Sequence, residues 1–164
     1  MLDIDAVGIC LKCKQPLYLA ETAFDVGQQW KATTTHCQFL HGYGVSFKVW
    51  FEGELDDRNW VWDFGGMKRA KTKIDGKSPK EWMDYMFDHT IIVAKDDPEL
   101  EGFKTMNTSK VAQVRIVPAT GAEKFAEFIY HKLNPFVQVE TNGRVKVKQV
   151  EFKEHGKNSA IYSE

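Results

Sequence analysis

A regular alternation of apolar and polar residues predicts a long β-strand that begins at residue 43. The apolar residues at every second position are Tyr43, Val45, Phe47, Val49 and Phe51. The residues that alternate with them are Gly, Ser, Lys, Trp and Glu. A period of two is typical of a strand that buries one face. An apolar-rich segment at residues 17–24 is a candidate for its antiparallel neighbour.

Shorter runs with the same character predict further strands, at residues 60–64, 111–118, 144–152 and 159–164. The run at 111–118 ends at a proline, which has no N–H to donate to a neighbouring strand. Valines alternate with charged residues at 144–152, and the segment at 159–164 is a candidate to return beside it.

Capping boxes, which mark the starts of helices, are predicted at two places. Ser78 lies three residues before Glu81, which is the spacing of a capping box, and a stripe of apolar residues follows. A second helix is predicted from Thr120, with Glu123 completing a similar box and Pro135 ending the helix. Strands in pairs with helices between them favour an α+β domain with an antiparallel sheet.

The composition indicates one globular domain. The 164 residues fit a single domain, 1–164, in which residues 1–20 form an atypical N-terminal extension. A net charge of −1, with acids and bases mixed along the chain, gives no electrostatic case for a nucleic acid or an anionic membrane as partner. No apolar run approaches the roughly 20 residues of a membrane span. Three cysteines, an odd number, fit a reducing compartment, so we expect a cytoplasmic protein.

Two pairs of residues are candidates for proton transfer. Cys37 lies four residues before His41, and a neighbouring imidazolium lowers the pKa of a thiol so that it can act as a base or nucleophile. The alternative is that Cys37 is a small buried apolar residue. In the Asp88–His89 pair, the carboxylate can orient the imidazole and raise its basicity. The alternative there is a solvated histidine at the end of a helix.

Glu151 is a candidate for ligand recognition. It shares one face of a predicted strand with Gln149, and a carboxylate can accept two parallel hydrogen bonds from the guanidine-like edge of a pterin or purine. The alternative is an ordinary exposed strand glutamate. Cys10 and Cys13 form a single C-x-x-C, which supplies only half of a tetrahedral zinc site.

The order of these segments resembles the 6-pyruvoyl-tetrahydropterin synthase and 6-carboxy-tetrahydropterin synthase family. The segments and the family patterns that they resemble are FDVGQ (24–28) for Phe-x-Ala-Ala-His, CQFLHGY (37–43) for Cys-x-x-x-His-Gly-His, VWDF (61–64) for a hydrophobic Asp-Phe, FDH (87–89) for Leu-Asp-His, PATGAE (118–123) for Pro-Thr-x-Glu, and VEFKEHGKNSAIY (150–162) for Val-x-Glu with a nearby Tyr. The resemblance implies the tunnelling fold. In that fold a four-stranded antiparallel sheet has helices on one face, and the chains assemble into a β-barrel.

The resemblance also implies an activity. The expected function is that of a lyase of pterin or queuosine-precursor biosynthesis that acts on 7,8-dihydroneopterin triphosphate. Its pocket would be shared between subunits of a homo-oligomer, a hexamer built from two trimeric rings. By the same resemblance, Cys37 is the general base, Asp88 and His89 form a proton relay, and Glu151 anchors the pterin. Glu123 is a further candidate for the pterin edge.

Members of the family bind one zinc ion through three histidines, and this chain departs from that pattern. His41 matches one ligand position, whereas Gln28 and Tyr43 occupy the other two. Three interpretations remain open. The chain is a lyase or isomerase that works by another route, it recruits a different metal ligand such as His36, or it binds a pterin or purine without catalysis. The joint presence of the other site residues favours an enzyme.

Overall fold

The computed structural model describes residues 5–10, 22–27 and 39–164. The strands are β1 (Asp5–Cys10), β2 (Thr22–Gly27), β3 (His41–Gly53), β4 (Thr90–Ala94), β5 (Gln113–Val117), β6 (Val145–His155) and β7 (Asn158–Ser163). The helices are α1 (Gly66–Arg69), α2 (Pro79–Phe87), α3 (Leu100–Thr108) and α4 (Ala122–Glu140).

All the described strands belong to one mixed sheet with the order β5-β4-β2-β3-β6-β7, and β1 also pairs with β3. The strands β2, β3, β6 and β7 form an antiparallel unit, whereas β1, β4 and β5 pair in parallel with their neighbours. The α+β class is therefore confirmed. The expected sheet had four antiparallel strands, whereas the described sheet has seven strands, of which these four form the antiparallel part. Apolar alternation cannot predict β4, because that strand is buried at four of its five positions and so lacks a polar face.

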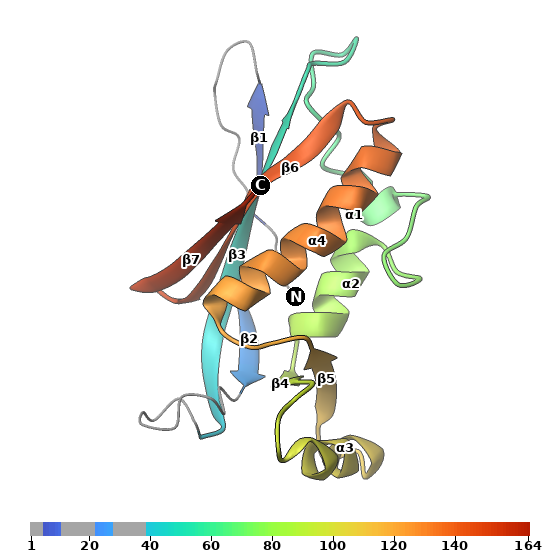
Figure 1. The fold of residues 1–164 in the computed structure, drawn as a ribbon. Helices are drawn as coiled ribbons and strands as arrows, with labels where there is room; N and C mark the ends of the chain where they lie inside the picture. The colour runs from blue at the N-terminus through green and yellow to red at the C-terminus, as the bar shows by residue number, and fades with distance from the viewer. Residues whose placement is uncertain (1–4, 11–21, 28–38) are drawn as a thin grey trace.

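Strand β3 buries the face that the alternation predicts. Val45, Phe47, Val49 and Phe51 are all buried, while the residues between them are only partly buried. Figure 1 shows α4 and α2 on the same side of the sheet. Aromatic side chains fill the layer between sheet and helices, with ring centroids 5.7 Å apart for Phe47 and Phe87.

Helix α2 begins as predicted, whereas α4 departs from the prediction at both ends. The Ser78 hydroxyl accepts a hydrogen bond from the backbone N–H of Glu81, and the Glu81 carboxylate accepts one from the N–H of Ser78. Helix α4 instead starts after Gly121 with no side-chain cap, and it continues through Pro135 to Glu140. The residues after that proline include Phe136 and Val137, which are buried, so their packing compensates for the missing hydrogen bond.

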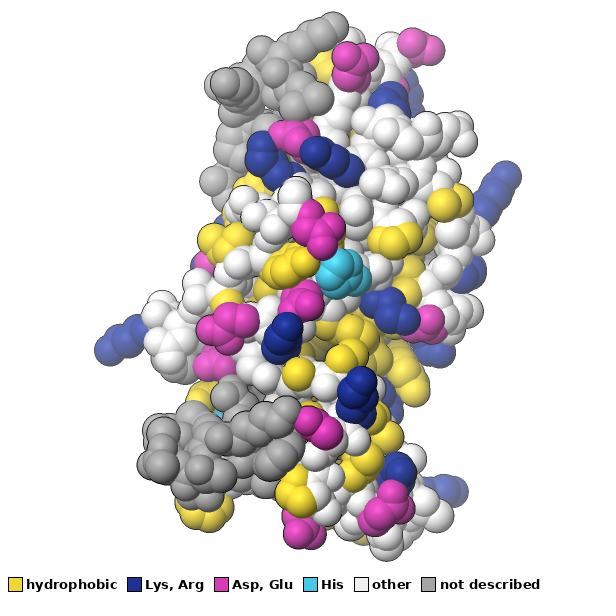
Figure 2. Space-filling model, in the orientation of Figure 1, with side chains coloured by type: hydrophobic (Ala, Val, Ile, Leu, Met, Phe, Trp, Pro, Cys, Tyr) yellow, Lys and Arg dark blue, Asp and Glu magenta, His cyan; other side chains and the backbone are white. Residues whose placement is uncertain are grey.

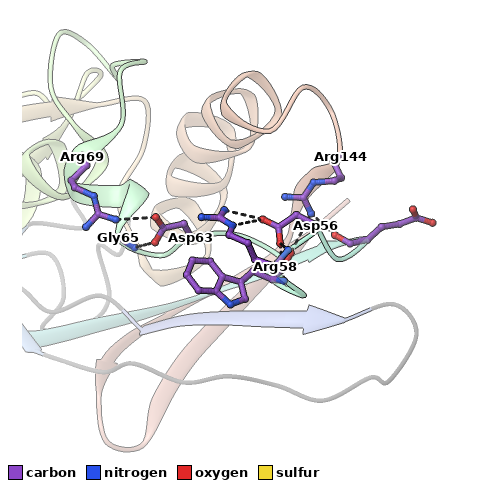
Figure 3. A network of polar contacts seen from close by, with 8 residues as sticks. Asp56, Arg58, Asp63, Gly65, Arg69 and Arg144 are labelled. Carbon is purple, nitrogen blue, oxygen red and sulfur yellow. Dashed lines mark hydrogen bonds and ion pairs between the residues drawn. The ribbon is translucent and has the colours of Figure 1, made fainter.

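Residues 60–64 form a loop rather than the predicted strand (Figure 3). Asp56 accepts hydrogen bonds from the backbone N–H groups of Trp60 (3.0 Å) and Arg58 (2.9 Å) and from the Arg58 guanidinium (2.8 Å). These contacts hold the pKa of Asp56 below its usual range. Asp63 accepts from the N–H of Gly65 at 2.9 Å. Val61 and Trp62 in this loop are buried, so their apolar character reflects core packing.

The face of the molecule that carries α4 presents both charged and hydrophobic side chains (Figure 2). Basic and acidic side chains are interspersed there without a patch of one sign (Figure 2). Among the helices of the described ranges, none has the length and apolar character of a membrane span.

Candidate functional site

The first part of the candidate site is the start of β3. His41 Nδ1 lies 2.6 Å from the carbonyl oxygen of Phe39. This nitrogen therefore carries the proton, and Nε2 is left as the basic nitrogen of the ring. The rings of His41 and Tyr43 meet edge to face with their centroids 4.9 Å apart. The two side chains thus share one face of the strand, as predicted, and Tyr43 also packs against the core.

The second part is the Asp88–His89 pair, at the junction of α2 and β4. His89 Nδ1 and Asp88 Oδ1 are 2.7 Å apart. Side chains of adjacent residues usually point apart, but His89 has a φ of 54°, in the left-handed region, which turns the chain sharply from helix to strand. The His89 side chain is 79% exposed. The contact between the two side chains is therefore formed, and the other ring nitrogen of His89 is accessible to a ligand.

Strand β2 lies between these two parts and aligns them along the sheet. Asp25 of β2 is in register with Tyr43 of β3 on one side and with Thr90 of β4 on the other. Neighbouring strands are about 4.8 Å apart, so the backbones at Tyr43 and Thr90 are about 10 Å apart. His89 directly precedes Thr90, so the Asp88–His89 pair lies near the level of Tyr43 in the sheet, two strands away.

Glu151 lies elsewhere. It is opposite Lys48 in the ladder between β3 and β6, on the face that α2 and α4 leave uncovered. The side chain is only 14% exposed, and Lys153 Nζ is 3.6 Å from its carboxylate. His41 and Tyr43 are on the opposite face, and Tyr43 is about 17 Å from Lys48 along the strand. One chain therefore does not bring Glu151 together with the two pairs.

Three residues of the predicted site lie outside the part of the chain that the structure describes, so their positions are not compared with the prediction. Cys37, Gln28 and His36 lie outside the described residues, although Gln28 directly follows Gly27, which pairs with His41. Glu123 is an exposed residue in the first turn of α4. That turn follows the end of β5 farthest from His89, because Thr90 pairs with Gln113 and Ala94 pairs with Val117.

A pocket beside His89 was not anticipated from the sequence. Its volume is about 350 Å³, and it is lined by His89, Asn107, Lys110, Val111, Ala112 and Gln113. Most of these residues belong to the end of α3 or to the segment that joins it to β5. A start signal for α3 is present in retrospect, since Asp97, Pro98 and Glu99 precede its apolar residues.

By the resemblance noted above, His41, Gln28 and Tyr43 would occupy the family's zinc positions, and this donor set does not fit a zinc ion. A catalytic zinc site needs about three good protein ligands and prefers imidazole or thiolate. His41 offers an imidazole with a free Nε2, but Tyr43 offers a phenol, which is protonated at neutral pH, and Gln28 offers an amide. Within the described ranges, no three His, Cys, Asp or Glu side chains gather as a metal site.

The fold defines a class of proteins. A chain of Caenorhabditis elegans 6-pyruvoyl tetrahydropterin synthase is similar to this one with a TM-score of 0.57 and 19% identity, over 88% of this chain and 91% of the other. An uncharacterized protein from Wolinella succinogenes has a TM-score of 0.68, also at 19% identity, over 88% of this chain and 94% of the other. These similarities establish a tetrahydropterin synthase-like fold.

The chain belongs to the 6-pyruvoyl tetrahydropterin synthase family, whose sequence profile matches residues 19–164. Relatives include the 6-carboxy-5,6,7,8-tetrahydropterin synthases of Rickettsia typhi and Rickettsia felis. Each is 27% identical to this chain over 121 residues, which are 73% of this chain and 80% of the relative.

We expect the purified protein to hold little zinc, and the double variant Gln28→His with Tyr43→His to bind it. The substitutions raise the number of imidazoles at the family positions from one to three. Isothermal titration with zinc and elemental analysis measure the change, and Gln28→Asn with Tyr43→Phe is the matched control without added imidazoles. Stoichiometric zinc in the unmodified protein, or no uptake by the double histidine variant, contradicts this expectation.

Proposed function

We propose that this chain is a tetrahydropterin synthase-like lyase that acts on 7,8-dihydroneopterin triphosphate and releases triphosphate. Membership of the family and the relatives named 6-carboxy-tetrahydropterin synthase support this class of reaction. The single observation that carries the proposal to this chain is the hydrogen bond between Asp88 and the exposed His89. It supplies an oriented imidazole where the family pattern requires one. The reaction belongs to pterin or queuosine-precursor biosynthesis.

The proposed roles follow from the chemistry of the side chains. Cys37 acts as the general base that removes a carbon-bound proton from the side chain of the substrate. His89 returns or relays a proton through Nε2, because Asp88 holds its Nδ1 proton and supports the positive charge of the imidazolium. No step is assigned to a metal ion.

Glu151 is the proposed anchor for the pterin ring. Its carboxylate is largely withdrawn from solvent, which strengthens hydrogen bonds to a charged acceptor. Farther along β3, hydrogen bonds from Lys148 and Lys146 lower the pKa of Glu52.

The positions of these residues favour a site shared between chains. Glu151 and the two pairs lie on opposite faces and far apart in one chain, so a second copy is needed to complete one pocket. The outer strands of the described sheet, β5 and β7, each have one edge without a neighbour, and such edges favour association. A hexamer that closes into a barrel is the proposed assembly.

A second function remains, in which the chain binds a pterin or purine without turnover. The residues at the three proposed zinc positions favour this second function, because two of them are not histidines and the zinc ion that would act as the Lewis acid lacks two of its ligands. Turnover separates the two functions.

The purified protein should convert 7,8-dihydroneopterin triphosphate and release triphosphate, and Cys37→Ala should abolish this turnover because it removes the proposed base. Triphosphate release and product absorbance measure the reaction, and particle mass checks that the variant still assembles. Cys13→Ala is the matched control and should retain activity. Binding of the pterin without turnover by the unmodified protein would support the second function instead.

Glu151→Gln should weaken pterin binding by about 1.5–3 kcal/mol, the scale of a hydrogen bond to a charged group. An amide has one acceptor oxygen and presents an NH2 group to the donors of the pterin edge. Isothermal titration with the pterin measures the loss, with Glu154→Gln as a control on the same strand. Equal affinity of the unmodified and Glu151→Gln proteins removes the anchor role.

The protein should be larger than a monomer at micromolar concentration, because one chain does not assemble the pocket. Light scattering coupled to size exclusion measures the mass. A monodisperse species of 18.8 kDa, the mass of one chain, would contradict both the shared pocket and the proposed hexamer.

A further inference from the structure

The pocket beside His89 has side chains that act as hydrogen-bond donors. The lining contributes an imidazole from His89, an ammonium from Lys110 and two amides from Asn107 and Gln113. None of the lining side chains is a carboxylate, and Asp88, the carboxylate next to them, is held by His89. The polar side chains that line the pocket therefore offer hydrogen-bond donors and no anionic acceptor.

Hydrogen bonds within the chain fix the orientation of both amides. The backbone N–H of Val114 donates to Asn107 Oδ1 at 3.0 Å, and the guanidinium of Arg115 donates to Gln113 Oε1 at 2.9 Å. Since each of these donors must face an oxygen, the oxygen of each amide is engaged, and its NH2 group is the end that can donate to a ligand. Both amides thus offer donors.

Lys110 adds a positive charge without a carboxylate partner among the described residues. It follows α3, where the last carbonyl groups of a helix normally carry partial negative charge. Here the carbonyl oxygens of Thr105, Met106 and Asn107 accept hydrogen bonds from residues 109–112. Because those carbonyl groups already accept hydrogen bonds, they are less available to accept from the ammonium group of Lys110.

We propose that this pocket binds the triphosphate group of the substrate, through Lys110, the NH2 groups of Asn107 and Gln113, and the imidazole of His89. The inference rests on the proposed function for the identity of the ligand, whereas the preference for a polyanion rests on the lining alone. A volume of about 350 Å³ is at the lower end for small-molecule sites. It fits a compact anionic group beside His89, with the rest of the substrate outside the pocket.

The binding test uses sodium tripolyphosphate and the full chain in isothermal titration. Lys110→Ala should weaken binding about tenfold or more, the effect of losing one charge-assisted hydrogen bond. Gln113→Glu should weaken it at least as much, because the carboxylate still accepts from Arg115 and replaces the donor with an anion. Lys104→Ala is the matched control: it removes the same charge from α3, but Lys104 is paired with Glu101 at 2.7 Å. Its affinity should be unchanged.

Two results overturn the inference. The first is no measurable binding of tripolyphosphate to the unmodified protein, and the second is an equal loss in Lys104→Ala and Lys110→Ala, which indicates only a general charge effect. A third titration compares 7,8-dihydroneopterin triphosphate with 7,8-dihydroneopterin. The preference for the triphosphate form should shrink about tenfold in Lys110→Ala, which assigns the pocket to the substrate rather than to a free polyphosphate.

The same experiments separate this inference from the proposed function. Turnover with an unchanged KM in Lys110→Ala overturns the pocket assignment and leaves the lyase proposal standing. Tripolyphosphate binding that depends on Lys110, in a protein that neither binds nor converts the pterin, overturns the lyase proposal and the assignment to its substrate, and leaves a polyphosphate site.

Discussion

Burial of one face of β3 is the constraint on which the rest of the structure depends. This strand pairs with β1, β2 and β6, and its apolar face forms the floor of the core beneath α2 and α4. A slip of one residue would move all its buried side chains to the other face. The register of β3 is therefore strongly determined, and with it the positions of His41 and Tyr43 at the start of the strand and of the residues aligned with them on β2.

The candidate site derives from this register together with one unusual backbone conformation. Strand β2 carries the alignment from β3 to β4, and the left-handed conformation of His89 turns its ring toward Asp88 at the start of β4. The polar pocket lies beside His89 because Gln113, which lines the pocket, begins β5 opposite Thr90. Rigid elements thus position the polar groups, while Glu151 stays on the other face.

The sequence predicted those parts of the fold where local pattern and final packing agree. The alternation in β3 and the capping box of α2 are local signals, and the structure confirms both. The prediction failed where packing overrides local preference, as at Pro135, which the burial of the following turn keeps within α4. It also failed at residues 60–64, where apolar residues enter the core from a loop. Asp88 and His89 were predicted as a candidate pair, but the geometry of their contact could not be predicted, because it depends on a left-handed backbone conformation at His89 that residues other than glycine rarely adopt.

The backbone of His89 places two unlike demands on one position. A side chain with a Cβ in the left-handed region is strained by about 1 kcal/mol or more, which glycine avoids and asparagine tolerates better than most residues. An optimisation of this chain for thermal stability alone would therefore favour replacing His89 and would remove the imidazole from Asp88 and the pocket. Engineering for stability and engineering for chemistry conflict at this residue, so a stabilised version of the protein should be built with position 89 held constant.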